Sequence, residues 1–174
     1  MHGRRAFGML AVVLAVAFVA LAAIPAVDAG DSDATVATGV YYVGGEGAND
    51  DNAGTSAAPF ATIQKAIDVD AEKIVLNGDI KLADNVAVTA DGISVTSDKT
   101  LEIDLNGHTI SYITTNTTGT AYYAIRNAGT LTVSDSSEAA TGGIIVQGYP
   151  IGVFGNLGTL TINGGTFETK AINT

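Results

Sequence analysis

Two short motifs recur along this chain at the same spacing, and this repeat restricts the fold more than any other feature. Residues 74–78 (Ile-Val-Leu-Asn-Gly) match residues 103–107 (Ile-Asp-Leu-Asn-Gly) 29 positions later. Residues 127–133 (Asn-Ala-Gly-Thr-Leu-Thr-Val) match residues 156–162 (Asn-Leu-Gly-Thr-Leu-Thr-Ile), again 29 positions later. A period of this length, built of short β-prone runs and turns, is typical of a solenoid. A helical repeat would need longer segments with helical periodicity, which do not occur after Ala71.

Within each repeat, apolar and polar residues alternate, as expected for strands with one buried face. The residues expected to point inward are Leu101, Ile103 and Leu105, then Leu131 and Val133, then Leu160 and Ile162. The residues expected to point outward are Glu102, Asp104, Thr132 and Thr161. If each repeat forms one coil, Leu101, Leu131 and Leu160 stack on one another. The pattern therefore predicts an all-β fold, a right-handed parallel β-helix.

Asparagines recur at the predicted turns. Asn77 and Asn106 occupy equivalent positions of the first pair of motifs, and Asn127 and Asn156 occupy equivalent positions of the second pair. We expect each pair to stack at a turn, where the side-chain amides form a ladder of hydrogen bonds along the axis. The neighbouring glycines are expected to supply the positive φ that a sharp corner requires.

One short helix is predicted ahead of the first coil. Pro59 precedes apolar residues at positions 60, 63, 66 and 67, with polar residues on the other side, which is typical of an amphipathic helix with proline near its start. A β-prone run and a loop rich in Gly, Asn and Asp come before it. We expect residues 40–72 to form a strand, a loop and a capping helix, and residues 73–174 to form the coils.

The start of the chain has the order of a secretory signal. Arg4 and Arg5 are followed by a run without charge at residues 6–23. Pro25 then interrupts this run, and residues 27–29 (Val-Asp-Ala) are small or compact at the positions that a signal peptidase recognises.

We therefore expect residues 1–29 to be a signal peptide cleaved after Ala29, and residues 30–39 to be a flexible leader. The alternative is an uncleaved membrane anchor, because about 18 apolar residues can just span a bilayer. In either case we expect the remainder of the chain to be secreted or at the cell surface.

The composition excludes several classes of site. The chain has no cysteine, which rules out a disulfide framework, a thiolate metal site and a cysteine nucleophile. Its formal net charge is −10, from 18 acidic and 8 basic residues, and the basic residues are scattered along the sequence. Recognition of phosphates needs clustered positive charge, so we expect no nucleic-acid partner.

Two groups of residues carry a resemblance to a known superfamily. The first is Tyr-Tyr-Val at 41–43, the polar loop after it, and residues 54–67 (Gly-Thr-Ser-Ala-Ala-Pro-Phe-Ala-Thr-Ile-Gln-Lys-Ala-Ile). This segment resembles the entry segment of pectin-lyase-like β-helix proteins, in which a strand and a short helix cap the N-terminal end. The second group, residues 105–110 and the repeated Asn-x-Gly-Thr-Leu-Thr motif, resembles coils of large secreted adhesin-like surface proteins. The resemblance spans about residues 40–174 and implies the fold more specifically than the function, because the same solenoid carries lyases, hydrolases, adhesins and stalks.

An oxygen-rich loop lies ahead of the predicted helix. Its potential ligands are Glu46, Asn49, Asp50, Asp51 and Asn52. Such side chains can bind Ca²⁺, but the loop lacks the regular alternation of an EF-hand. We expect these residues to be solvated and the chain to hold no metal or cofactor, with Ca²⁺ as the alternative.

Two acidic residues share the outward face of one predicted strand. Glu102 and Asp104 lie two residues apart, roughly 6.5–7 Å along the strand. This is near the carboxyl spacing of inverting glycosidases, about 6.5–9.5 Å. Any strand with acids at positions i and i+2 has the same spacing, so we expect a solvated face without a catalytic role.

Arg126 and His108 are the only arginine and the only histidine after the predicted signal peptide. A lyase of the pectate type needs a cationic base beside a bound metal ion, and Arg126 has no acidic cluster near it in sequence. One histidine cannot assemble a nucleophilic triad or a histidine-rich metal site. We expect both residues to lie on the surface and assign no catalytic residues.

Tyrosines are the best candidates for sugar binding, since an aromatic face can stack on a flat partner. The four candidates are Tyr112, Tyr122, Tyr123 and Tyr149. If Tyr122 and Tyr123 lie in one strand they point to opposite faces, so at most one is exposed. Core or rim packing is the favoured role for all four. Separately, Asn116 begins an Asn-Thr-Thr sequon and is a candidate glycosylation site.

The last repeat stops at residues 170–174, in mid-coil and without a capping element. An uncapped coil exposes strand edges that recruit other chains, so we expect a longer protein or self-association through this coil. The predicted function is that of an adhesin-like binding scaffold for glycans or neighbouring surfaces. The alternatives are a carbohydrate-active enzyme (a polysaccharide lyase or a glycoside hydrolase) and a purely structural wall component.

Overall fold

The structure is a computed structural model that describes residues 38–149 and 151–170. The predicted signal peptide (1–29) and most of the predicted leader (30–39) lie outside these residues. The elements are β1 (Val40–Val43), α1 (Ile63–Asp68), β2 (Lys73–Leu76), β3 (Ile80–Val86), β4 (Ile93–Val95), β5 (Thr100–Asp104), β6 (Thr109–Thr114), β7 (Tyr122–Asn127), β8 (Thr130–Ser134), β9 (Gly143–Gln147), β10 (Ile151–Asn156), β11 (Thr159–Ile162) and β12 (Thr166–Lys170).

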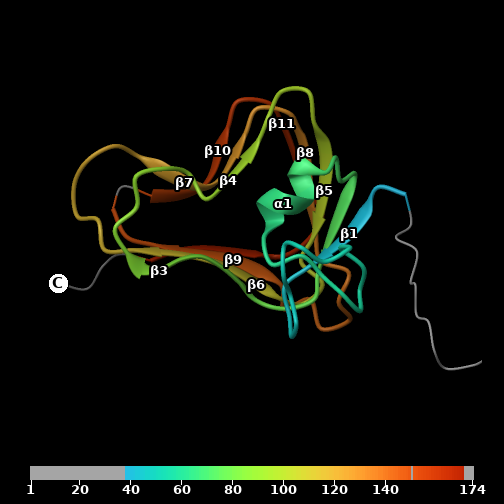
Figure 1. Cartoon of the computed structure of the whole chain (residues 1–174). Helices are drawn as coiled ribbons and strands as arrows, with labels where there is room; N and C mark the ends of the chain where they lie inside the picture. Colours follow the sequence, from blue (N-terminus) through green and yellow to red (C-terminus); the bar gives the residue numbers. More distant parts are fainter. Residues whose placement is uncertain (1–37, 150, 171–174) are drawn as a thin grey trace, which may run out of the picture. The chain divides into compact units, whose positions relative to one another are not determined.

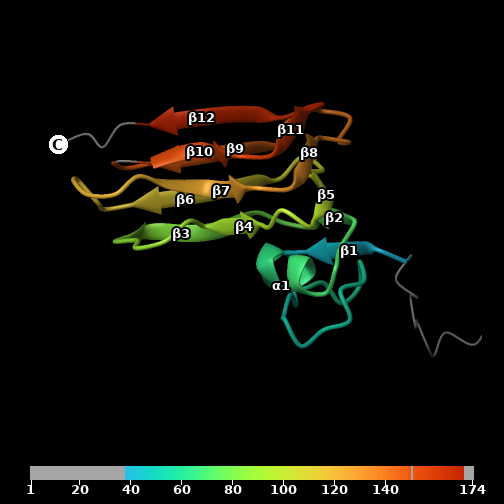
Figure 2. The same ribbon diagram turned by 90° about the horizontal axis from the view of Figure 1, so that it is seen from above.

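The strands form three parallel sheets, with the orders β1-β2-β5-β8-β11, β4-β7-β10 and β3-β6-β9-β12. Each coil contributes one strand to each sheet: β2, β3 and β4 form the first coil, and β11 and β12 begin the fourth. Figure 2 shows the coils stacked from β1 to β12. In Figure 1 the path from β5 through β6 to β7 turns clockwise as the chain recedes from the viewer, which is a right-handed path. The predicted parallel β-helix is confirmed.

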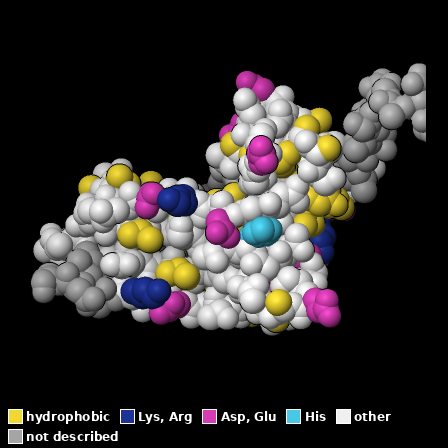
Figure 3. Space-filling view, turned by 90° about the horizontal axis from the view of Figure 1, so that it is seen from below, with side chains coloured by type: hydrophobic (Ala, Val, Ile, Leu, Met, Phe, Trp, Pro, Cys, Tyr) yellow, Lys and Arg dark blue, Asp and Glu magenta, His cyan; other side chains and the backbone are white. Residues whose placement is uncertain are grey.

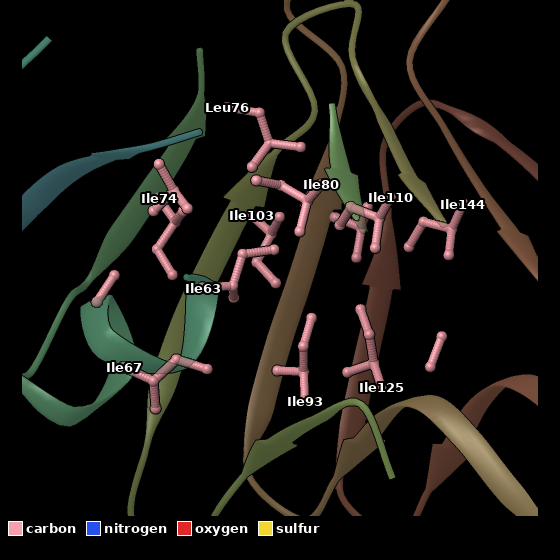
Figure 4. Close-up of a cluster of buried hydrophobic side chains, with 14 of the residues drawn as sticks. Ile63, Ile67, Ile74, Leu76, Ile80, Ile93, Ile103, Ile110, Ile125 and Ile144 are labelled. Carbon is pink, nitrogen blue, oxygen red and sulfur yellow. The ribbon is translucent and has the colours of Figure 1, made fainter. Parts of the chain in front are cut away.

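The interior is filled by columns of apolar side chains that stack from coil to coil. Leu101 pairs with Leu131 and Leu131 with Leu160, as predicted. A second column in the same sheet consists of Ile74, Ile103, Val133 and Ile162. The other two sheets supply the columns Ile80, Ile110 and Ile144 and Ile93, Ile125 and Phe154. Figure 4 shows isoleucines from all three sheets converging on one core, whose buried side chains come from β1 to β9 and α1.

The spacing of the sequence repeat holds throughout one sheet and only in part in the other two. In the sheet that contains β5, neighbouring strands pair at or very near this spacing, for example Lys73 with Glu102. In the sheet that contains β6, Thr109 pairs with Gly143, which is farther along the chain than one repeat, and Gly143 pairs with Thr166, which is nearer than one repeat. The turns between sheets therefore differ in length, although each coil returns to the β5 sheet after nearly the same length of chain.

The N-terminal segment packs against the first coil. β1 pairs with β2, and the other edge of β1 is occupied by the loop, because Tyr42 N donates to Gly54 O and Phe60 N donates to Tyr42 O, both at 2.9 Å. The buried face of α1 consists of Ile63, Ala66 and Ile67, which join the core. The strand edge at this end of the sheet is thus covered (Figure 2).

The tightest corner joins the β4-β7-β10 sheet to the next coil. Here Asn127, which is fully buried, donates from Nδ2 to Asn156 Oδ1 at 2.7 Å and to Thr159 O at 2.9 Å. Its Oδ1 accepts from Gly129 N at 3.1 Å. The amides of Asn127 and Asn156 are therefore directly bonded along the axis.

Asn77 and Asn106 use their amides differently. Asn106 Nδ2 donates to Leu76 O and Asn77 Nδ2 donates to Ser56 O, each at 2.9 Å. Each side chain bonds to the backbone of the preceding layer, and among the described contacts the two amides do not bond to each other.

The expected positive φ at the corner glycines is wrong at Gly78, Gly129 and Gly158 and right at Gly107, where φ is 82°. Gly129 and Gly158 must be glycine because there is no room for a Cβ atom at either position. A Cβ at Gly129 would meet the carbonyl oxygens of Thr96 and Lys99, and a Cβ at Gly158 would meet that of Gly129. Glycine lets successive corners approach closely.

Candidate functional site

The acidic pair on β5 is part of an ion-pair network and not a solvated face. Lys73 Nζ on β2 lies 2.9 Å from Glu102 Oε1 and 3.2 Å from Asp104 Oδ2. Ser134 Oγ on β8 donates to Glu102 at 2.7 Å, and Ser136 N donates to Asp104 at 2.9 Å. Asp104 is only 3% exposed, so the expectation of solvation is wrong for this residue. The alternation of apolar and polar residues along a strand predicts which way a side chain points. Its burial depends on the residues of the neighbouring coils that contact it.

Burial opposes the ionisation of Asp104, but hydrogen bonds from Ser136, Lys73 and Asn106 outweigh it and lower the pKa of the carboxyl. Hydrogen bonds from Lys73 and Ser134 lower the pKa of Glu102. Both carboxylates are therefore held ionised by contacts that join three coils. A carboxylate with these partners is suited to stabilising the stack and not to donating a proton as a general acid.

Acid is expected to destabilise the fold through these carboxylates. Because their pKa values are lowered by folding, their stabilisation is complete above the pKa of an unfolded carboxyl, about 4, and is lost as the pH falls through the folded value. We expect the free energy of unfolding in urea to be constant between about pH 7 and pH 5 and to fall below about pH 4. Asp104→Asn should lower the free energy of unfolding by about 2 kcal/mol at pH 7. The further fall of this free energy below about pH 4 should be less steep in the variant.

Asp84→Asn is the control, because Asp84 pairs with Lys81 at 2.8 Å on an exposed surface. It should change the free energy of unfolding by less than about 0.5 kcal/mol. An acid limb that is equally steep in Asp104→Asn and in the unmodified chain would show that other carboxylates carry the acid sensitivity.

His108, another candidate, and Lys170 also lie near acidic side chains. His108 Nδ1 lies 3.7 Å from Asp79 Oδ1 in a turn, and Lys170 Nζ lies 3.2 Å from Glu168 Oε2. In Figure 3 the two basic groups at the left each lie next to an acidic side chain, whereas other acidic side chains on this face stand alone. This arrangement is typical of a solvated protein surface.

The oxygen-rich loop uses its side chains to fold itself. Asp50 accepts hydrogen bonds from Ala61 N and Thr62 N at 2.9 Å and from Thr62 Oγ1 at 2.8 Å. Asn52 Nδ2 donates to Gly47 O and Pro59 O. Within residues 38–149 and 151–170, no three His, Asp or Glu side chains are grouped so that they could hold a metal ion. The same residues contain no helix of the length and apolarity needed to cross a membrane.

A cleft of about 390 Å³ lies between α1 and the first coil, a feature that the sequence does not signal. It is lined by small residues such as Gly44 and Gly92, by Ile80 and Leu82, and by the charged Asp79 and Lys81. Thr62 and Gln64 also line it; Lys81 Nζ pairs with Asp84 at 2.8 Å, and Asp79 Oδ1 accepts from Thr109 N at 2.9 Å. The cleft therefore has both apolar and polar groups in its wall, and none of the site residues predicted from the sequence lines it.

The four tyrosines lie in different environments. Tyr112 is 2% exposed and donates its hydroxyl proton to Ala90 O, and burial raises its pKa. Tyr122 packs against the core, whereas Tyr149 is 57% exposed in a turn. Tyr123 is half-buried and is not among the side chains packed against the core. Tyr123 and Tyr149 are thus the two that a ligand could reach.

Tyr123 and Arg126 form a platform on the outer face of the β4-β7-β10 sheet. The Arg126 guanidinium carbon lies 5.6 Å from the centroid of the Tyr123 ring. Gly152 and Gly155 on β10 lie beneath the ring, and a Cβ at Gly155 would come within 2.5 Å of it. Two glycines three residues apart are the signal in the sequence that could have revealed this flat support. We call Tyr123, Arg126, Gly152 and Gly155 the Tyr123–Arg126 platform.

Arg126 differs from most other basic residues of the described chain. Among residues 38–149 and 151–170, no carboxylate lies within 4.0 Å of its guanidinium, whereas Lys73, Lys81, Lys99 and Lys170 all pair with acids. The guanidinium lies over the Tyr123 ring in a cation–π contact and still has several N–H donors. Such donors are suited to hydroxyl or carboxylate oxygens.

Asn116 is half-buried and joins two turns of neighbouring coils. Its Nδ2 donates to Val88 O at 2.8 Å, and its Oδ1 accepts from Val88 N at 2.9 Å. Attachment of a glycan to Nδ2 would compete with the first of these contacts.

No protein-family model, curated protein or solved structure matches this chain. The class to which it belongs is therefore defined by its coils, which make it a parallel β-solenoid.

Proposed function

We propose that this chain is an adhesin-like binding scaffold without catalytic activity in this segment, and that it recognises glycans through the Tyr123–Arg126 platform. The observation that carries the proposal is the Tyr123 ring supported by glycines beside a guanidinium without a carboxylate partner among the described residues. The signal-like N-terminal sequence and the acidic composition support a location outside the cell. Kinship with the pectin-lyase-like superfamily is part of the same proposal and rests on the motifs of residues 41–67.

The platform suits a polymer better than a small molecule. Small ligands usually bind in concave pockets that bury most of their surface, and a strand surface lined with glycines is flat. A pyranose ring can stack on the tyrosine, and Arg126 can donate to a ring hydroxyl or to a carboxylate of an acidic sugar. Sugar units on either side would then lie along the face of the solenoid.

The proposal predicts that Tyr123→Ala weakens glycan binding about tenfold, which corresponds to the loss of one stacking contact of about 1.4 kcal/mol. The full chain would be tested by calorimetry against polygalacturonate as an acidic probe and galactan as a neutral probe. Arg126→Gln should weaken binding of polygalacturonate more than that of galactan, because only the former has a carboxylate for the guanidinium. Tyr149→Ala, which removes the other exposed tyrosine, should leave both affinities unchanged.

Two results would contradict the proposal. Equal losses in Tyr123→Ala and Tyr149→Ala would show that the platform is not the binding site. Release of an unsaturated uronate product from polygalacturonate, with or without Ca²⁺, would make the chain a lyase and replace the scaffold by the enzyme alternative.

A further inference from the structure

Ser94 on β4 lies directly beside Arg126 on the outer face of the β4-β7-β10 sheet. The two residues are register partners, and neighbouring strands of a sheet lie about 4.8 Å apart. Ser94 is exposed between the buried Ile93 and Val95, so its side chain points outward. Within residues 38–149 and 151–170, neither the Ser94 hydroxyl nor the Arg126 guanidinium has a hydrogen-bond partner. Two adjacent polar groups on this face are thus available to a ligand.

The helix α1 continues this polar surface away from the platform. It contacts β4 at the first coil, as Figure 2 shows. Ser94 N donates to Gln64 Oε1 at 3.1 Å, and Gln64 Nε2 donates to Asp68 Oδ1 at 3.0 Å. Gln64 therefore uses both ends of its amide within the protein and holds the exposed Asp68 carboxylate in place. A line of groups runs along the axis from Arg126 through Ser94 to Asp68, and it consists of a cation, a hydroxyl and a carboxylate.

The opposite side of the platform offers no such side chains. The register partners of Tyr123 and Arg126 on β10 are Gly152 and Gly155, which have no side chain that could bond a sugar hydroxyl. Along β7 itself, residues 124–125 between Tyr123 and Arg126 are buried. A polymer that leaves the platform therefore finds side-chain hydrogen bonds in the direction of α1.

Charge along this line favours a carboxylate of the ligand at one position only. The Arg126 guanidinium can bond a carboxylate with two parallel N–H donors. Asp91, whose Oδ1 accepts from Tyr123 N at 2.7 Å, and the exposed Asp68 flank it with negative charge. An ionised carboxylate accepts hydrogen bonds and donates none, so Asp68 suits the hydroxyl groups of a neutral sugar and repels an acidic one.

We propose that Ser94 and Asp68, oriented by Gln64, form a second subsite, and that a bound glycan runs along the solenoid axis from Arg126 toward α1. This inference rests on the proposed glycan binding by the platform and narrows its ligand to a class, a polysaccharide in which neutral sugars adjoin a uronate. The uronate carboxylate accepts from Arg126. Hydroxyl groups of the next sugar bond to Ser94 Oγ and donate to Asp68.

The first test uses two acidic polysaccharides that differ in charge spacing. Hyaluronan alternates glucuronate with N-acetylglucosamine, whereas every unit of polygalacturonate carries a carboxylate. In calorimetry on the full chain, Asp68→Asn should strengthen binding of polygalacturonate about fivefold, because repulsion is removed. The same variant should weaken binding of hyaluronan about threefold, because a charged acceptor is lost. A residue with a merely structural role would weaken both.

Asp84→Asn is the matched control for charge. It changes the net charge as Asp68→Asn does, but Asp84 lies on β3 in another sheet. It should leave the ratio of the two affinities unchanged. Circular dichroism would check that each variant folds.

The second test addresses occupancy at residue 94 itself. Ser94→Ala should weaken binding of both glycans about fivefold through the loss of one hydrogen bond. Ser56→Ala, at an exposed serine in the loop beside β1, should change neither affinity. Because the chain has no cysteine, a single introduced thiol can be followed by maleimide alkylation. Saturating hyaluronan should slow alkylation of Ser94→Cys and should not slow that of Ser56→Cys.

Each outcome decides the proposal. Opposite changes of the two affinities in Asp68→Asn, with protection of the thiol at residue 94, support the second subsite. Weaker binding in Tyr123→Ala and Arg126→Gln, without an effect of the Ser94 and Asp68 variants, overturns the subsite and leaves the proposed function intact. Failure of Tyr123→Ala to alter binding, or no binding of any glycan, overturns both.

Discussion

Truncation of Ile103 to alanine is expected to lower the free energy of unfolding by about 3 kcal/mol. Ile103 is fully buried between Ile74 and Val133 in the same column, and strands from neighbouring coils hold it on both sides. Removal of its side chain leaves a cavity that the paired backbones cannot close. Urea unfolding followed by circular dichroism measures the loss.

Ile162→Ala is the matched control, since Ile162 belongs to the same column but is half-exposed. It should lower the free energy of unfolding by less than about 1 kcal/mol at a protein concentration where the chain is monomeric. Equal losses at positions 103 and 162 would mean that the last coil is covered in solution.

Gly129→Ala should destabilise the fold by about 2–3 kcal/mol, although it adds a single methyl group. The added Cβ would meet the carbonyl oxygens of Thr96 and Lys99, which belong to the backbone of the preceding corner and cannot rotate away. The corner would have to open, and with it the hydrogen bond from Thr130 N to Lys99 O. Thermal and urea unfolding of the variant would detect both the loss and any change in cooperativity.

The neighbouring substitution Thr130→Ala controls for the position, because Thr130 is exposed at the start of β8. A change of less than about 0.5 kcal/mol is expected. If Gly129→Ala changed the free energy of unfolding as little as Thr130→Ala, the corners could move apart to admit a Cβ. Glycine would then not be needed for their close approach.

Much of the fold could be predicted because a solenoid repeats its contacts. The match of residues 127–133 with 156–162 predicts which side chains stack, and Leu131 and Leu160 do pair. Burial on the outer face could not be predicted in this way. Asp104 is outward on its own strand, but Lys73 from one neighbouring coil and Ser136 from the other enclose it.

The candidate site was only partly predictable. The opposite orientation of Tyr122 and Tyr123 follows from strand geometry. Which of the two faces the core depends on the pairing of β7 with β10, where glycines at 152 and 155 leave room for the Tyr123 ring. A sequence pattern lists tyrosines, but Arg126 lies over Tyr123 in the same strand although the two are three residues apart, a spacing that puts side chains on opposite faces of a regular strand.

The corners of the coil differ in how much length they tolerate. Two residues, 128–129 and 157–158, join β7 to β8 and β10 to β11, and four residues, 96–99, join β4 to β5 at the same corner of the first coil. The connection from β8 to β9 spans residues 135–142, while the equivalent connection from β11 to β12 spans only 163–165. Insertions and deletions during evolution can therefore accumulate at the second kind of corner without disturbing the core. One scaffold can in this way present varied loops along one side while its interior columns stay the same.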